Sequence, residues 1–339
     1  MTAPEKLASS STQAVRASGG IAVVGSVNMD LVVRLPRHPR PGETLMGSDY
    51  TMNPGGKGAN QAVAAARLGA SVSFVGRVGS DEFGHRLAGA LEEAGVDTAG
   101  LGRSQGPSGV AFIQVDERGQ NSIVVSPGAN YALSASDLDA PAARRALERA
   151  TVLLLQLEVP LNVTLAAAAA GRRAGANVVL NLAPARRLEV DELKDVSLLL
   201  VNEHEARIQL GAEAEGKGPS DWARALCDYV PSVIVTLGAE GAVWAQRDED
   251  GGANGSARWG HVPAFPVTAV DTTAAGDAFG GALAYYLDEA TREGRAAPLE
   301  EAVRFASAAG AVTTTRAGAQ PALPSLAEVR ALMAREARA

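Results

Sequence analysis

The stretch from Asp271 to Asp277 has the composition of an anion-binding loop that leads into a helix. The small residues Ala274, Ala275 and Gly276 precede the carboxylate of Asp277, and an amphipathic run follows over residues 278–287. Small side chains let backbone N–H groups approach a ligand, and the first turn of a helix carries unpaired N–H donors and a positive dipole end. A transferring phosphate would be stabilised there, and Asp277 could accept the proton of an attacking hydroxyl. Taken alone, Asp277 fits an ordinary helix cap or first-turn acid equally well.

A second glycine-rich stretch, residues 53–61, stands ahead of a helix expected over residues 62–68. It is not a Walker A loop, because Gly58 follows Lys57 where that pattern requires Ser or Thr. Glycines such as Gly56 would let the backbone approach a small polar ligand, while Asn60 would hydrogen-bond its hydroxyl groups. A tight turn before a helix is the structural alternative.

Polar residues also follow two of the predicted strands. Asn28 and Asp30 come just after the apolar run Ile21–Val24, and Glu158 comes after residues 152–157. Ligands of open α/β sheets bind outside the carboxyl ends of the strands, so these side chains are candidates for binding a small molecule. Asp30 could accept hydrogen bonds from two hydroxyls of a polyol, although a turn aspartate is the simpler interpretation.

Two further motifs are candidates for contacts to a metal ion or a nucleotide. Asn202 and Glu205 open a helix expected over residues 203–210, and they form either a capping box or contacts to Mg²⁺ through water. The turn from Thr236 to Gly241 joins two expected strands and contains Gly238. It could border a nucleotide or simply close a hairpin.

The elements that position these residues alternate between strand and helix, which predicts a doubly wound, mainly parallel α/β sheet flanked by helices. Strands are expected over residues 21–24, 71–75, 152–157, 178–182, 197–201, 233–237 and 242–245, and an extended run over 267–270. Helices are expected over residues 62–68, 82–94, 161–173, 203–210, 221–229, 277–290, 299–314 and 325–337. Two β excursions, over 31–52 and 110–125, predict a small lid sheet beside this domain. The α/β domain is expected to span residues 20–339, and residues 1–19 are expected to form a disordered tail.

Composition excludes several classes of protein. The chain has 339 residues, 46% of them hydrophobic, and a net charge of -7, which gives no basic surface for nucleic acid. Cys227 is the only cysteine, so there is neither an internal disulfide nor a cysteine metal cluster. No apolar run is long enough to cross a membrane, and the tail lacks the apolar segment of a secretory signal. We therefore expect a soluble, cytoplasmic protein that binds no membrane.

Five segments, taken in order, carry a resemblance to a known family. They are residues 25–30, 55–62, 202–205, 271–277 and 316–321, with the sequences GSVNMD, GGKGANQA, NEHE, DTTAAGD and RAGAQP. This set resembles the PfkB-type, ribokinase-like family of carbohydrate kinases, and its ribokinase branch in particular, from about residue 20 to the C-terminus. The resemblance implies transfer of the ATP γ-phosphoryl group to the 5-hydroxyl of D-ribose, with Mg²⁺ required, K⁺ as activator and a homodimer formed through the lid sheet.

The resemblance also implies roles for individual residues. Asp277 is implied as the catalytic base, with the amides of Ala274, Ala275 and Gly276 as the anion hole. The implied sugar-binding residues are Asn28, Asp30, Gly56, Lys57, Gly58, Asn60 and Glu158. The implied ATP-binding residues are Asn202, Thr236, Gly238, Gly241, Gly276 and Ser307. Mg²⁺ is implied near Glu205 and Asn202, and K⁺ at Asp271, Thr273, Thr313, Arg316, Gly318 and Ala322.

Four positions depart from the family pattern. Thr273 stands where Ile is frequent, Ser307 where His or Asn is usual near the adenine, and Ala322 where Ser often contributes to the cation site. Residues 181–184 read Asn-Leu-Ala-Pro in place of the commoner Asn-Pro-Ala-Pro. Other acceptors of the same family, 2-deoxyribose, a ketohexose or a nucleoside, remain alternatives, as does a non-catalytic sugar sensor of the same fold.

Overall fold

The computed structural model describes residues 19–247 and 257–336 of the chain. Apart from Gly19, the predicted disordered tail lies outside the described residues, as does most of the polar loop after Arg247.

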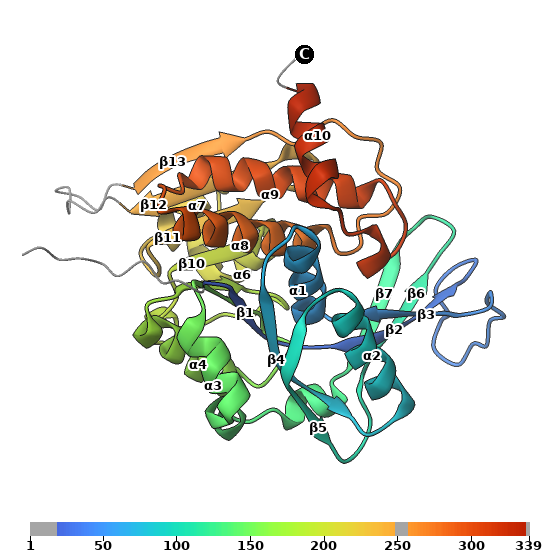
Figure 1. Cartoon of the computed structure of the whole chain (residues 1–339). Coiled ribbons are helices and arrows are strands. Elements are labelled where there is room, and N and C mark those ends of the chain that lie inside the picture. The colour runs from blue at the N-terminus through green and yellow to red at the C-terminus, as the bar shows by residue number, and fades with distance from the viewer. Residues whose placement is uncertain (1–18, 248–256, 337–339) are drawn as a thin grey trace, which may run out of the picture.

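A nine-stranded sheet runs through the centre of the molecule in the order β13-β12-β11-β10-β9-β8-β1-β4-β5 (Figure 1). Its strands are β1 Ile21–Val24, β4 Val72–Gly79, β5 Asp97–Ser104, β8 Val152–Leu155, β9 Asn177–Asn181, β10 Leu198–Asn202, β11 Ser232–Thr236, β12 Ala242–Arg247 and β13 Ala257–Val262. Neighbouring strands from β5 to β11 pair in parallel, and β12 and β13 continue the sheet antiparallel. The doubly wound, mainly parallel sheet predicted from the βα alternation is thereby confirmed.

Helices cover both faces of this sheet because its short apolar strands bury alternate side chains on opposite sides. Ile21 and Val23 pack in one core with helices α1, α2, α8, α9 and α10, whereas Ala22 and Val24 pack in a second core with α3, α4, α6 and α7. The α-helices are α1 Lys57–Arg67, α2 Glu82–Glu93, α3 Pro141–Arg149, α4 Leu161–Ala174, α5 Val190–Leu193, α6 Glu203–Leu210, α7 Pro219–Leu226, α8 Ala275–Glu293, α9 Leu299–Thr314 and α10 Leu326–Glu336. The 3₁₀-helices are η1 Gly128–Ala132, η2 Ala135–Asp139, η3 Gly211–Ala214, η4 Gly238–Glu240 and η5 Gln320–Ala322.

A separate four-stranded sheet in the order β3-β2-β6-β7 projects to the right of the domain in Figure 1. Its strands are β2 Asn28–Arg34, β3 Thr51–Gly55, β6 Gly109–Val115 and β7 Asn121–Ser126. The two predicted β excursions do pair with each other, through parallel β2 and β6. Residues 45–50, however, lie outside any strand, so the extended stretch predicted over 45–52 begins only at Thr51.

Several predicted boundaries were wrong. Helix α1 begins at Lys57 instead of residue 62, because Gly56 adopts a φ of 89° and starts the helix within the glycine-rich stretch. Residues 267–270 form no strand, and strands β5 and β13 had no clear sequence signal. Asn28 and Asp30 do follow β1, but they open β2 of the small sheet, where the prediction had the strand begin only at residue 31.

Candidate active site

The carboxylate of Asp277 lies in the first turn of α8 and is held by two amides of α1. Asn60 Nδ2 donates to Asp277 Oδ2 over 2.9 Å, and Gln61 Nε2 donates to Oδ1 over 3.2 Å. The side chain is 7% exposed, and its burial raises the pKa of the carboxyl. The charge of Lys57 and the two amide donors oppose that rise. Asp277 is therefore much more than a surface helix cap.

The turn ahead of α8 has an unusual backbone at Ala274. Its φ is 59° and its ψ is 9°, and among the described residues it is the only non-glycine with a positive φ. An L-residue is strained in this left-handed region. Such strained residues cluster at functional sites. The turn leads the chain into a helix start whose early N–H groups have no partners within the helix, as the predicted anion-binding loop requires.

Four carboxylates surround one ammonium group at the centre of the site. Burial alone would lower the pKa of Lys57, but the charges of Asp277, Glu158, Glu205 and Asp30 together raise it, so the amine stays charged. Burial raises the pKa of Asp30 to about 7, with help from the charges of Glu158 and Asp277, and burial also raises the pKa of Glu205. The charge of Lys57 therefore offsets part of the negative charge of these carboxylates, near the place where a phosphate would have to enter.

Glu158 lies in the loop between β8 and α4, where hydrogen bonds fix its carboxylate. Its Oε2 accepts from Ser26 Oγ over 2.6 Å and from the Lys57 backbone N–H over 3.1 Å. Gly58 has to be a glycine here, because a Cβ at that position would lie 2.7 Å from the backbone nitrogen of Ser26. The glycines of this stretch thus serve close packing of α1 against the end of β1.

The two polar residues of β2 are also anchored. Asn28 Oδ1 accepts from Asn130 Nδ2 over 2.7 Å, and Asn130 further exchanges hydrogen bonds with both backbone groups of Val27. Asp30 lies against β3, where a Cβ on Gly55 would come within 2.1 Å of Asp30 Oδ2. The backbone of Gly56 also passes close to β2, since its own Cβ would lie 2.7 Å from the nitrogen of Asn28.

At the other end of the site, Asn202 and Glu205 form the predicted capping box of α6. Asn202 Oδ1 accepts from the Glu205 N–H over 2.9 Å, and Glu205 Oε2 accepts from the Asn202 N–H over 2.7 Å. A cavity of about 230 Å³ connects this cap with Asp277. It is lined by Lys57, Asn181, Ala183, Leu200, Val201, Asn202, Glu205, Thr236, Thr272, Ala274, Gly276 and Asp277. The structure therefore brings together the predicted base, the anion loop and part of the predicted nucleotide site.

The remaining predicted nucleotide residues do not line this cavity. Gly238 and Gly241 form the η4 turn with φ values of 56° and 96°, and a Cβ on Gly241 would lie 2.1 Å from Val262 O. Ser307 lies in α9, and its Oγ is buried without a hydrogen-bond partner in the described part of the chain.

Hydrogen bonds join three of the predicted cation residues, Asp271, Thr273 and Gly318, whereas Thr313, Arg316 and Ala322 make other contacts. Asp271 Oδ1 accepts from the N–H and the hydroxyl of Thr273, and Asp271 Oδ2 accepts from the Gly318 N–H over 2.9 Å. Burial would raise the pKa of Asp271, but these hydrogen bonds hold it below its usual value. Thr313 is fully buried, with its hydroxyl donating to Ala309 O, and Arg316 pairs with Glu328. Ala322 is buried in η5 and offers no side-chain oxygen.

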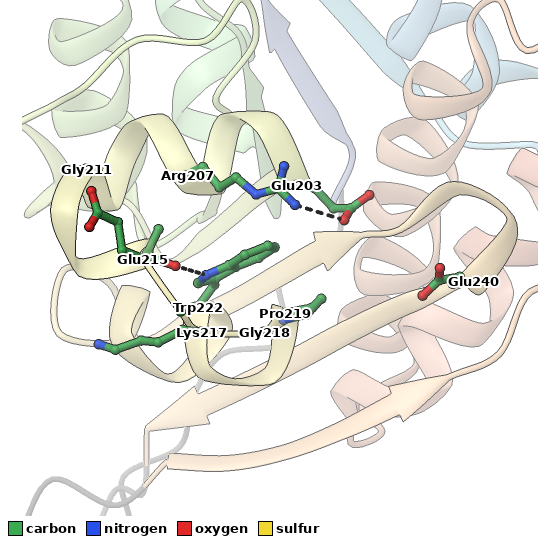
Figure 2. A pocket seen from close by; sticks show the side chains of 11 residues that line it. Glu203, Arg207, Gly211, Glu215, Lys217, Gly218, Pro219, Trp222 and Glu240 are labelled. Atoms are coloured by element: carbon green, nitrogen blue, oxygen red, sulfur yellow. Dashed lines mark hydrogen bonds and ion pairs between the residues drawn. The ribbon is translucent and has the colours of Figure 1, made fainter.

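A larger cavity of about 590 Å³ lies beside the nucleotide turn, between α6, η3 and α7 (Figure 2). The guanidinium of Arg207 lies 4.7 Å from the ring centroid of Trp222, and the indole N–H donates to Ala214 O. Arg207 also pairs with Glu203 across 3.6 Å. None of the predicted site residues lines this cavity, whereas several of them line the smaller one.

Four buried polar residues of the site were missed by the sequence analysis: Ser26, Gln61, Asn130 and Gln156. Each of them is at most 1% exposed, and each forms a hydrogen bond with a residue at least 32 positions away in the sequence. The one signal available in the sequence was that an apolar run follows Gln61 and that leucines flank Gln156. Buried polar groups need partners, so such positions are candidates for polar networks.

Three further findings concern residues outside this cavity. Cys227 is buried, and desolvation raises the pKa of its thiol to about 12, as befits a core residue. In the described ranges there is no group of three or more His, Cys, Asp or Glu side chains suited to a metal ion. Within those ranges, too, no helix combines the length and the apolar character that crossing a membrane requires.

Comparison with known proteins bears on what this arrangement does. The model of the pfkB family carbohydrate kinases matches residues 19–326. Among curated proteins, a ribokinase of Haemophilus influenzae is 39% identical over 312 residues, which are 91% of this chain and 96% of that protein. A deoxyribokinase of Salmonella typhi is 38% identical over 311 residues, which are 90% of this chain and 96% of that protein. A solved structure of Arabidopsis thaliana ribokinase complexed with ribose and ATP has a TM-score of 0.79 and 31% identity. The match covers 93% of this chain and 99% of that one.

Proposed function

This chain belongs to the pfkB family of carbohydrate kinases, and we propose that it transfers the γ-phosphoryl group of ATP to the 5-hydroxyl of D-ribose. An ATP-dependent sugar kinase follows from the family, and its ribokinase relatives favour the pentose. The observation that carries the mechanism is the carboxylate of Asp277, buried at the start of α8 and held by two amides. It stands where a base must stand if an incoming hydroxyl is to attack a phosphate bound at the helix N-terminus.

In this proposal the sugar lies between β2 and the start of α1. Asp30 and Asn28 bind ring hydroxyls from β2, and Lys57, Asn60 and Glu158 bind from the opposite side, with Gly56 and Gly58 keeping the backbone close. Asn60 supports this placement, because its Oδ1 is buried without a partner among the described residues while its Nδ2 is bound to Asp277. A sugar hydroxyl would satisfy that oxygen.

The nucleotide lies at the other end of the cavity in this proposal. Asn202 and Thr236 flank the phosphates, and the η4 turn with Gly238 and Gly241 borders the nucleoside. Ser307 replaces the usual adenine partner, and its unpartnered Oγ supports a contact there. As the hydroxyl loses its proton to Asp277, the negative charge of the phosphoryl group is stabilised by the amides of Ala274, Ala275 and Gly276.

The residues fit Mg²⁺ as a metal that ATP brings with it. Mg²⁺ keeps much of its water and needs only one or two carboxylates besides the phosphates, so the lack of a dedicated cage in the described ranges agrees with this role. Glu205 and Asn202 would hold it at the cavity wall, Glu205 through water. When bound, Mg²⁺ would supply positive charge to the phosphates.

The loop behind Asp277 fits a hard monovalent cation, because its donors are oxygens. Asp271, Thr273, Thr313, Arg316, Gly318 and Ala322 would contribute, several through backbone carbonyls. K⁺ there would fix the shape of the turn that carries Ala274. Since Ala322 lacks a hydroxyl, we expect weaker K⁺ coordination than in relatives with a serine at that position.

A coupled assay of ADP release tests the substrate assignment. We expect the highest kcat/KM with D-ribose among ribose, 2-deoxyribose, fructose and adenosine, and a lower rate when K⁺ is replaced by Na⁺. Equal or higher kcat/KM with another acceptor would transfer the assignment to that acceptor. Sugar binding without ADP production would instead identify a sensor that has kept the fold.

2-Deoxyribose is the second candidate, because the Salmonella typhi relative is named a deoxyribokinase at almost the same identity as the ribokinase.

We expect the enzyme to act in the cytoplasm, where ATP is available and Cys227 stays reduced.

We also propose that the small sheet closes over the sugar to exclude water and forms the interface of a homodimer. Supporting this, Phe112, Ile123, Val124 and Val125 of β6 and β7 are 44–65% exposed, although they are large and apolar. Because Phe112 pairs with Val124 and Ile113 with Ile123, these side chains cover both faces of the hairpin.

The double substitution Ile123→Asp with Val124→Asp places a charge on each face of this hairpin. We expect it to convert a dimer into a monomer in sedimentation equilibrium, since the interface would have to bury unpaired charges. Val190→Asp, at a 52% exposed valine of α5, is the matched control and should leave the mass unchanged. A wild-type monomer, or a double variant that stays dimeric, would refute this interface.

A further inference from the structure

We propose that Gln61 and Gln156 form a two-amide relay that fixes the orientation of the Asp277 carboxylate. Gln156 Nε2 donates to Gln61 Oε1 over 2.6 Å, and Gln61 Nε2 donates to Asp277 Oδ1 over 3.2 Å. The inference rests on the proposed role of Asp277 as the base. Both glutamines act through another residue, so they are positioning residues.

The relay fixes which end of each amide faces the base. A glutamine side chain has one acceptor end and one donor end. Because the Gln61 oxygen is already occupied by the Gln156 N–H, its NH₂ group must face the carboxylate. Rotating the Gln61 amide by half a turn would set its oxygen against Asp277 Oδ1 and its NH₂ against the NH₂ of Gln156, which is unfavourable at both ends. One arrangement of the three side chains is thereby selected.

Gln156 stands where the main sheet can hold it rigidly. It directly follows β8, is fully buried, and its carbonyl accepts from Thr164 Oγ1 at the start of α4. Its amide fits only because residue 25 has no side chain, since a Cβ on Gly25 would lie 2.1 Å from Gln156 Oε1. The relay therefore runs from the central strands to the first turn of α8.

The oxygen of the Gln156 amide indicates that this residue serves the site and does not stabilise the fold. Gln156 Oε1 is buried without a hydrogen-bond partner among the described residues. A buried unsatisfied oxygen costs stability, so a methionine of similar size should be tolerated or even preferred by the fold. The glutamine has a use only through its N–H, which reaches Gln61.

Loss of the relay should act on Asp277 in a defined direction. The carboxylate is buried, and donation from Gln61 is among the interactions that stabilise its charged form. Without that donor the carboxyl holds its proton to higher pH and is free to turn away from the incoming hydroxyl. We therefore expect kcat to fall and the pH at which activity appears to rise. The KM values for sugar and ATP should stay unchanged.

The test uses Gln61→Met, Gln156→Met and the double variant in the full-length enzyme. For Gln61→Met we expect kcat at neutral pH to fall roughly 10- to 100-fold, as for a lost hydrogen bond to a charged group, and the acid limb of the kcat profile to move up by about one pH unit. Gln156→Met should show a smaller effect of the same kind. The double variant should match Gln61→Met, because Gln156 acts only through Gln61.

Gln209→Met is the matched control. Gln209 is as fully buried and makes two hydrogen bonds, to the N–H and the carbonyl of Leu188, away from the base. We expect this variant to lose thermal stability with the acid limb unmoved. A shifted limb in Gln209→Met, or additive losses in the double variant, would overturn the relay.

A titration of the Asp277 carboxyl by ¹³C NMR, assigned through the Asp277→Asn variant, separates this inference from the proposed function. The midpoint should rise in Gln61→Met whichever sugar is the substrate, and an unchanged midpoint would overturn the relay. Absence of turnover with every sugar in the wild type would instead overturn the proposed function.

Discussion

Replacing Asp277 by asparagine is expected to lower kcat by a factor of about 10²–10⁴, the range for loss of a general base. The variant should fold, because the wild-type protein already pays for burying this carboxylate and an amide of the same shape removes that cost. An asparagine must set its NH₂ against the donor of either Asn60 or Gln61, which cancels part of that gain. We therefore expect a melting temperature close to that of the wild type.

The measurement is steady-state kinetics of ADP release together with thermal denaturation. Asp288→Asn serves as the control, because Asp288 is a buried aspartate of the same helix that accepts from Thr151 Oγ1 and lies three turns from the site. The control should keep its turnover even if its stability falls. Near wild-type turnover in a folded Asp277→Asn enzyme would remove Asp277 from the role of base.

The main sheet was predictable because its central strands are short, apolar and separated by amphipathic helices. β8 and β10 show this, since each is an unbroken apolar run followed by a polar residue that reaches the site. β5 was missed because its sequence, DTAGLGRS, has few apolar residues at this edge of the sheet. The place of Asn28 and Asp30 also depended on pairing of β2 with Gly109 and Gly55, which no local pattern contains.

The candidate site shows the same division. Asp277, Lys57 and Asn60 stand in glycine-rich stretches whose composition marks a close backbone approach. Gln61 ends one of these stretches and Gln156 stands in none, but neither position indicates a partner, and the two meet across 95 positions of sequence only because α1 packs beside β8. A buried glutamine looks alike in sequence whether it completes a core, as Gln209 does, or a site. Only the identity of its partner distinguishes the two.

Asp30 is expected to trade stability for sugar binding. Its pKa of about 7, against an ordinary value of 3.8, means that the folded protein binds a proton that the unfolded chain has released between these two pH values. The contribution of Asp30 to the free energy of unfolding should therefore fall as pH rises from about 4 to 7, by an amount of order 4 kcal/mol, and stay level above pH 7. Ionised Asp30 is costly to bury, yet it is the form that accepts two sugar hydroxyls.

Asp30→Asn should remove this pH dependence and make the sugar-free protein more stable at pH 8, measured by urea unfolding at several pH values. The same variant, like Asp30→Ala, should raise the KM for sugar at least about tenfold, since a charged acceptor is lost, and leave the KM for ATP nearly unchanged. Asp81→Asn is a control for which we expect the opposite change in stability. Asp81 accepts from Ser108 and Gly84, and although burial opposes it, these hydrogen bonds hold its pKa low, so its loss should destabilise the protein at pH 8. A less stable Asp30→Asn, or a fall in ATP affinity in place of sugar affinity, would show that Asp30 ionises normally or lies outside the sugar site.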